Sequence, residues 1–134
     1  MFGISENKLR DKLSNYQKVL LKLRVALQKD AHSDELYLDG TIQRFEFVYE
    51  LSWKLMKSYL EFEGIETSSP RTSFREAFKI GLISDATEWI KLMENRNRTS
   101  HTYNEETAWD IYEKIKTEYI FVFNEFEKKI IEKI

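Results

Sequence analysis

Three side chains with complementary chemistry stand close together in the stretch Arg96-Asn-Arg-Thr-Ser-His-Thr-Tyr. Arg96 is followed five residues later by His101 and two residues after that by Tyr103. A histidine can take or give a proton near neutral pH, and a guanidinium is permanently charged and binds a phosphate with two parallel donors. Together they suffice for metal-free RNA cleavage. His101 would activate the 2′-hydroxyl or protonate the leaving oxygen, and Arg96 would stabilise charge on the phosphate.

The same residues have a purely structural interpretation. An arginine and a histidine at a helix end commonly bind the last carbonyls or pair with acids. The stretch nevertheless contains no large aliphatic residue, although apolar helical patterns flank it on both sides. A polar cluster at a helix end is better placed to meet a ligand than to fill a core. A serine nucleophile at Ser100 is disfavoured because adjacent side chains rarely point together.

The composition excludes several other kinds of site. The chain has no cysteine, two histidines and four widely separated glycines. Disulfides, thiolate metal sites and glycine-rich phosphate loops are therefore absent from the sequence, and we expect neither a metal nor a cofactor. The net charge of −2, from 21 basic and 23 acidic residues, differs from the basic balance of a broad nucleic-acid platform. Any RNA contact should therefore be local.

Length and hydropathy favour one soluble unit. A chain of 134 residues with 42% hydrophobic residues can bury a core of its own. It has no run of about 18 apolar residues and no apolar signal region at its start. We expect a single domain over residues 1–134, no contact with a membrane and a cytoplasmic location.

The elements that would position these side chains are all helices. Apolar residues recur at helical spacing, strand-like alternation is missing, and the few glycines and the single proline mark the turns. His32, in the first connection, is interpreted as a solvated loop residue. The helices are expected from Lys8 to Leu27, from Glu35 or Thr41 to Phe62 before Gly64, from Thr72 to Ile80 after Pro70, from Ser84 as the cap to about Asn97, and from Asn104 towards the C-terminus.

Two acids in the second helix stand out from its apolar surface. Glu46 and Glu50 are four residues apart and therefore lie on one helix face, where like charges repel. They can form an exposed acidic edge, or they can hold an arginine from another helix. Arg96 and Arg98 are the natural partners in the second case.

Two further patterns each allow two interpretations. Arg71, Arg75 and Lys79 step by four along one face, which is either solvated or turned to a phosphate or a partner. Aromatic residues crowd the last helix over more than one face; they are Tyr119, Phe121, Phe123 and Phe126. That crowding indicates either a homodimer interface or dense packing within one core.

The Arg96–Tyr103 stretch resembles the R-x4-H-x-Y motif of HEPN domains. The longer string to Ala108 resembles the branch of nucleotidyltransferase substrate-binding proteins, relatives of the HepT toxins. Further resemblance lies in Gly40-Thr-Ile-Gln-Arg-Phe-Glu-Phe, Tyr49-Glu-Leu-Ser-Trp-Lys, Ser69-Pro-Arg and Arg75-Glu-Ala-Phe-Lys-Ile-Gly-Leu-Ile. It covers roughly residues 38–112, and the first helix matches only in pattern.

The resemblance implies an antiparallel four-helix bundle with a short additional helix, usually as a homodimer. It implies that the motifs of two protomers meet in a cleft, and that a minimal nucleotidyltransferase encoded nearby is the partner. The module would be similar to a toxin–antitoxin pair. In one account the protein is a toxin ribonuclease that the transferase silences by adenylylation of Tyr103. In the other it is a binding subunit that presents a nucleotide or substrate.

The resemblance also assigns positions. Arg96, His101 and Tyr103 match the motif directly, and Asn97 matches the polar residue that often follows the arginine. Glu46, Glu50 and Arg71 match positions typical of the branch without a defined role. The mixed charge around Arg96, Arg98 and His101 differs from a strongly basic RNA groove. We therefore place the binding subunit ahead of the ribonuclease.

Overall fold

The computed structural model describes residues 4–134, and that part of the chain contains helices and no strand. One 3₁₀ turn (Thr99–His101) and one π-helical turn (Ile115–Tyr119) interrupt the α-helices. The α-helices are α1 (Glu6–Leu27), α2 (Glu35–Phe62), α3 (Pro70–Lys79), α4 (Ala86–Arg98), α5 (Glu105–Lys114) and α6 (Ile120–Lys133).

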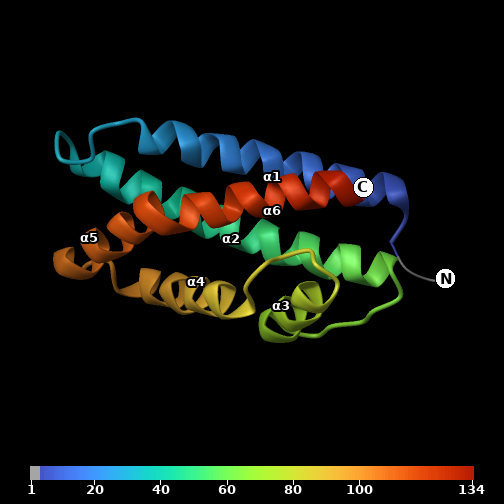
Figure 1. The fold of residues 1–134 in the computed structure, drawn as a ribbon. Coiled ribbons are helices and arrows are strands. Elements are labelled where there is room, and N and C mark those ends of the chain that lie inside the picture. Colours follow the sequence, from blue (N-terminus) through green and yellow to red (C-terminus); the bar gives the residue numbers. More distant parts are fainter. Residues whose placement is uncertain (1–3) are drawn as a thin grey trace.

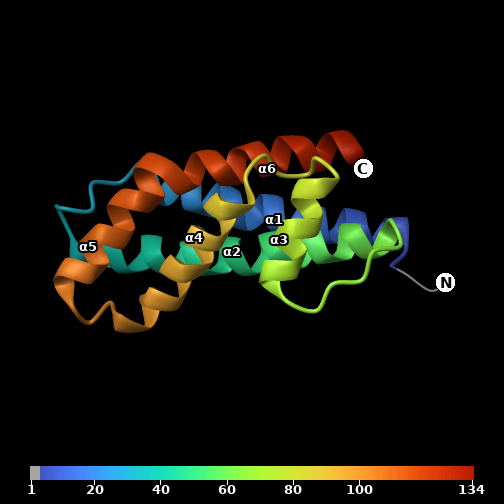
Figure 2. The ribbon, with the colours of Figure 1, turned by 60° about the horizontal axis from the view of Figure 1, so that its bottom comes forward.

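The helices form the predicted antiparallel four-helix bundle with a short additional helix. Helices α1, α2 and α6 run side by side along the long axis, and α4 lies obliquely over α2 (Figures 1 and 2). Helix α5 continues through the π turn into α6, so the two act as the fourth long element. Helix α3 is the additional one and crosses α2 beside α4 (Figure 2).

The core is built from the apolar stripes that the sequence predicts. On α1, Leu9, Tyr16, Leu20 and Leu23 are fully buried, one helical turn or two apart. The Tyr16 hydroxyl donates a hydrogen bond of 3.0 Å to the backbone carbonyl of Phe123, which ties α1 to α6. Every α-helix contributes buried residues to this core, including Phe45, Val48, Leu55, Met56, Phe74, Trp89, Leu92, Ile111, Phe126 and Ile130.

Most predicted helix ends are close to the observed ones, and one cap is wrong. Asn104 accepts a hydrogen bond from the backbone N–H of Thr107, as expected for the start of α5. Helix α4, in contrast, is capped by Asp85 and not by Ser84. The Asp85 carboxylate accepts from two backbone N–H groups of the first turn, whereas the Ser84 hydroxyl donates to Glu125 of α6.

The π turn explains part of the aromatic crowding on the last helix. A π turn inserts one extra residue and shifts the buried face of the helix after it. Tyr119, Phe123 and Phe126 are all buried in the core, while Phe121 keeps 64% of its surface exposed. Core packing accounts for three of the four aromatics, and the homodimer remains a prediction.

Candidate functional site

The Arg96–Tyr103 segment lies at the junction of α4 and α5, at the end of the bundle remote from the C-terminus (Figure 1). Helix α4 ends at Arg98, and a 3₁₀ turn carries the chain from Thr99 to His101. Within this segment Thr99 is buried, Arg96 and Arg98 are half-buried, and Ser100 and His101 are exposed.

Arg96 is held on its inner side by two groups. Its Nη1 atom lies 3.2 Å from Oε2 of Glu46 on α2 and donates a hydrogen bond of 3.1 Å to the Thr99 hydroxyl. The Thr99 hydroxyl in turn lies 3.1 Å from the same Glu46 oxygen. The arginine and glutamate side chains are only 30% and 29% exposed, so water screens their attraction incompletely. Glu46 therefore holds an arginine from another helix, which is one of the two roles that the sequence allows for Glu46 and Glu50.

The other two candidates for that pairing have different partners. Glu50 accepts a hydrogen bond from the Trp53 indole at 3.4 Å and lies 3.7 Å from the Lys54 ammonium. Arg98 forms an ion pair of 2.7 Å with Asp110 of α5. Two residues along an α-helix correspond to a rotation of about 200°, so Arg98 points away from Arg96.

Arg98 belongs to a network that fixes the end of α4 against α5 and the π turn. Its Nη1 atom also donates a hydrogen bond of 2.8 Å to the Asn95 amide oxygen, and the Asn95 amide nitrogen donates to the Tyr119 hydroxyl. The hydrogen bond from Arg98 is the main cause that lowers the pKa of Asp110. Burial is the main cause that raises the pKa of Tyr119 to about 12. Hydrophobic spacing does not identify Asn95, Asp110 or Tyr119 as members of this network, because their contacts depend on how α4, α5 and the π turn meet.

Two buried polar atoms beside the Arg96–Glu46 pair have no hydrogen-bond partner among the described residues. They are the Arg96 Nε atom and the Tyr49 hydroxyl. Burial raises the pKa of Tyr49, the charge of Glu50 raises it further, and the charges of Arg96 and Arg71 oppose this. Exposed Arg71 on α3 therefore acts electrostatically on the same region, even though it contacts none of the motif residues through a hydrogen bond or ion pair in residues 4–134.

His101 and Tyr103 form the outer part of the site. Tyr103 is 87% exposed, His101 is also exposed, and their ring centroids are 6.2 Å apart in an edge-to-face arrangement. Asn97 is exposed on the same segment, and its backbone carbonyl accepts a hydrogen bond of 3.1 Å from the Ser100 hydroxyl. The site thus combines a fixed inner arginine with two accessible rings.

His32 is an exposed residue of the loop between α1 and α2, as predicted, but it also makes a contact that the sequence does not indicate. Its ring stacks on Trp109 of α5, with centroids 4.2 Å apart and planes 7° from parallel. The loop between α1 and α2 is thereby attached to the element that follows the motif. Hydrophobic spacing gives no signal for such a contact between a loop and a distant helix.

Neither a metal site nor a membrane span is found in residues 4–134. No group of three or more histidine, cysteine, aspartate or glutamate side chains is placed to hold a metal ion. No helix in that range is long and apolar enough to cross a bilayer.

Comparison with known proteins places the chain in a family. The family model described as "Nucleotidyltransferase substrate binding protein like" matches residues 11–132. The chain belongs to this family. The match includes most of the first helix and confirms the resemblance that the motif and its flanking strings predict.

Similar proteins agree with membership of the nucleotidyltransferase substrate-binding family. A Haemophilus influenzae protein described as "Probable ribonuclease HepT" is 44% identical over 81 residues, which cover 57% of this chain and 56% of that protein. The chain thus matches little more than half of that relative's length. A crystal structure of a Thermus thermophilus protein has a TM-score of 0.75 and 31% identity, covering 83% of this chain and 94% of its own.

A second solved structure, from Haemophilus influenzae, is described as revealing the fold of a substrate binding domain of a nucleotidyltransferase. It has a TM-score of 0.68 and 29% identity to this chain, and it covers 92% of this chain and 96% of its own. The family's fold therefore extends over nearly the whole of the present chain.

Proposed function

We propose that this protein is the partner subunit of a minimal nucleotidyltransferase and binds nucleotide or substrate at the Arg96–Tyr103 segment. Family membership supports a transferase as the partner. The observation that carries the choice of surface is the pair of accessible rings, His101 and Tyr103, mounted next to a fixed arginine.

The ion pair that Arg96 forms with Glu46 favours a role in binding over a role in catalysis. The positive charge of Arg96 is already balanced by Glu46, so the arginine does not offer a free charge for a developing phosphorane. A paired arginine can still orient a ligand that adds to the pair, since its remaining N–H groups are donors. The exposed Tyr103 ring offers a face on which a base can stack, and His101 offers a ring nitrogen beside it.

The proposed assembly is a homodimer encoded beside its transferase in a two-gene module. Helix α6 supports a second interface because Phe121 and Ile131 remain 64% and 47% exposed. A contiguous exposed apolar patch is typical of surfaces that meet another chain, and these two side chains are the candidates for such a patch on α6.

The test is titration of the transferase encoded next to this gene into the purified protein by calorimetry, with and without nucleotide. His101→Ala and Tyr103→Ala should each weaken binding at least tenfold, and both should fold normally because both side chains are exposed. Tyr37→Ala, an exposed tyrosine on α2, is the matched control and should leave affinity within twofold. Equal binding by all four proteins would reject this surface.

A second candidate function, a metal-independent endoribonuclease, is favoured by the 44% identity to the probable ribonuclease HepT. In it, His101 would move the proton of the attacking 2′-hydroxyl or of the leaving 5′-oxygen, and Arg96 would stabilise the charged phosphorane. Silencing would attach adenylate to Tyr103. Its phenolic oxygen would attack the α-phosphorus of ATP, pyrophosphate would leave, and the phenolic proton would pass to solvent.

Incubation with total RNA in EDTA separates the two functions. The chain's two histidines provide a matched pair, since His32 lies on a loop stacked against Trp109. If the protein is a ribonuclease, the wild type and His32→Ala should cleave the RNA and His101→Ala should not. If the protein is a binding subunit, none of the three proteins should cleave the RNA.

A further inference from the structure

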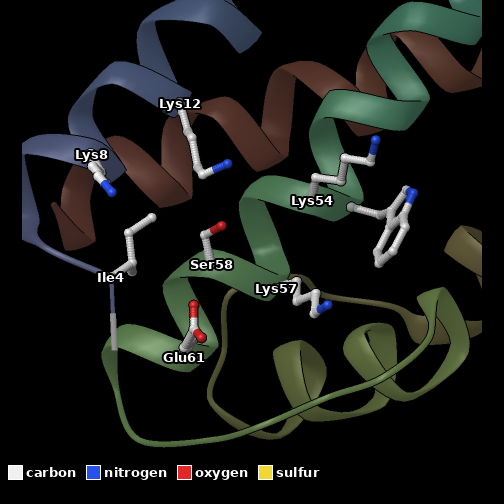
Figure 3. A pocket seen from close by; sticks show the side chains of 8 residues that line it. Ile4, Lys8, Lys12, Lys54, Lys57, Ser58 and Glu61 are labelled. Atoms are coloured by element: carbon white, nitrogen blue, oxygen red, sulfur yellow. The ribbon is translucent and has the colours of Figure 1, made fainter. Parts of the chain in front are cut away.

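A cavity of about 590 Å³ lies between the first half of α1 and the second half of α2, away from the motif (Figure 3). Lys8 and Lys12 extend into it from α1, and Ser58 and Glu61 face it from α2 (Figure 3). The remaining lining residues are Ile4, Trp53, Lys54 and Lys57. Its size is within the range of cavities that hold small organic ligands.

The cavity carries a concentrated positive charge in a chain whose net charge is −2. Four lysines and one glutamate line it. Of these four lysines, only Lys54 lies within 4 Å of a carboxylate of the described residues, that of Glu50 at 3.7 Å. Among the described residues, the exposed ammonium groups of Lys8, Lys12 and Lys57 have no such partner. Three ammonium groups without paired carboxylates around one cavity favour an anionic ligand over a neutral one.

Acidic residues flank the positive region on both sides along the chain. Glu46 and Glu50 precede it on α2, Glu61 lies at its far end, and Glu66 follows α2 in an adjoining cavity. A long nucleic-acid strand would need basic residues along its whole path, so the pattern fits a compact polyanion. Half-buried Trp53 is among the lining residues, and its indole ring offers a face against which a base can stack.

We propose that this cavity binds a nucleoside triphosphate. Its phosphates would lie among Lys8, Lys12 and Lys57, and its base would lie against Trp53. Glu46 of the motif region and Lys57 are 11 residues apart on α2, which corresponds to about 16 Å along the helix axis. The cavity is therefore a separate site, and the inference goes beyond the proposed function at the Arg96–Tyr103 segment.

The experiment is calorimetric titration of ATP in magnesium-free buffer at low ionic strength. Lys8→Gln/Lys12→Gln should weaken ATP binding at least tenfold. Lys18→Gln/Lys22→Gln is the matched control, because it removes the same charge from exposed lysines of the same helix, also four residues apart. Its affinity should stay within twofold of the wild type. Absence of ATP binding, or equal loss in both double variants, would overturn the proposal.

Further ligands and variants test the rest of the proposal. Trp53→Leu should weaken ATP binding several-fold while leaving tripolyphosphate binding unchanged, and adenosine alone should bind weakly. Tighter binding of a single-stranded RNA 20-mer than of ATP, lost in Lys8→Gln/Lys12→Gln, would overturn the choice of a compact ligand. The titration is repeated in His101→Ala, where ATP affinity should persist. Loss there would move the nucleotide to the motif and reject the separate cavity.

Discussion

Arg96 takes its position from groups on two elements. Glu46 comes from the middle of α2, and Thr99 comes from the 3₁₀ turn just beyond the end of α4. Because one glutamate oxygen lies close to both the arginine and the threonine, a change in any of the three affects the other two. Glu46 and Thr99 are positioning residues for the arginine.

Glu46 and Glu50, one turn apart on α2, give a direct comparison of that role. Glu46→Ala should lower the free energy of unfolding by about 1–2 kcal/mol, because Arg96 would remain half-buried without its carboxylate. Glu50→Ala should cost less than about 0.5 kcal/mol, since its contact with Lys54 is long and solvated. Urea unfolding measures both values. Equal costs would show that the Arg96–Glu46 pair contributes nothing specific.

Two buried tyrosines differ in whether their hydroxyl has a partner. Tyr49→Phe should be neutral or stabilise the protein by up to about 1 kcal/mol, because it removes a buried hydroxyl without a partner in residues 4–134. Tyr16→Phe should cost about 1 kcal/mol, because it removes the hydrogen bond to Phe123. Chemical denaturation checks the pair. A clear loss of stability in Tyr49→Phe would indicate that its hydroxyl has a partner in solution.

At the scale of elements, α4 matters most because it carries Arg96 to the end of the bundle. Its start is fixed by Asp85 and its end by the network of Arg98, Asn95 and Asp110. Sequence periodicity predicts that this helix exists and where it ends to within a residue or two. It does not identify the cap, because Ser84 and Asp85 are both good N-cap residues. The contact of Ser84 with Glu125 is made across the fold.

Separate substitutions of Ser84 and Asp85 test which of the two residues caps α4. Asp85→Ala should destabilise the protein by about 1 kcal/mol through loss of the helix cap. Ser84→Ala should cost less than about 0.5 kcal/mol, because its contact with Glu125 is exposed. Thermal unfolding followed by circular dichroism compares the two. The reverse order would mean that Ser84 is the cap after all.

The π turn places Tyr119 against α4 and makes stability sensitive to alkaline pH. The folded pKa of Tyr119 is raised to about 12, mainly by burial, above its ordinary value of 10.0. The folded state therefore keeps a proton that the unfolded state loses. This stabilisation is complete below about pH 10 and is lost as the pH rises through about 12.

Tyr119→Phe should reduce that dependence. Between pH 9 and pH 11.5 the variant should lose about 2 kcal/mol less of its free energy of unfolding than the wild type. Urea titrations at both pH values provide the measurement, and the difference between them removes the constant cost of the lost Asn95 hydrogen bond. Parallel pH profiles would contradict the raised pKa of Tyr119.

At the scale of the whole molecule, sequence reasoning predicts the architecture better than the contacts. Apolar spacing predicts the long helices, because burial of a stripe decides where a helix packs. The motif and its flanking strings predict the family. Contacts such as Arg98 with Asp110, or His32 with Trp109, depend on how separate elements meet, and neither pair shares a local pattern.

The bundle thus presents two different surfaces along α2. The motif end combines Glu46 with Arg96 and the exposed His101 and Tyr103. The other half carries the lysine-lined cavity. We expect a transferase that docks at the motif to leave the cavity open to solvent, so the two surfaces can be probed separately.

In the proposed function, the transferase and its nucleotide or substrate meet this protein at the Arg96–Tyr103 segment. Amide hydrogen exchange, measured with and without the proposed transferase partner, tests this most directly. Slower exchange over residues 96–104, with no change in α3, is the predicted result. Protection confined to α3, or to the cavity residues of α1, with residues 96–104 unaffected, would contradict the account.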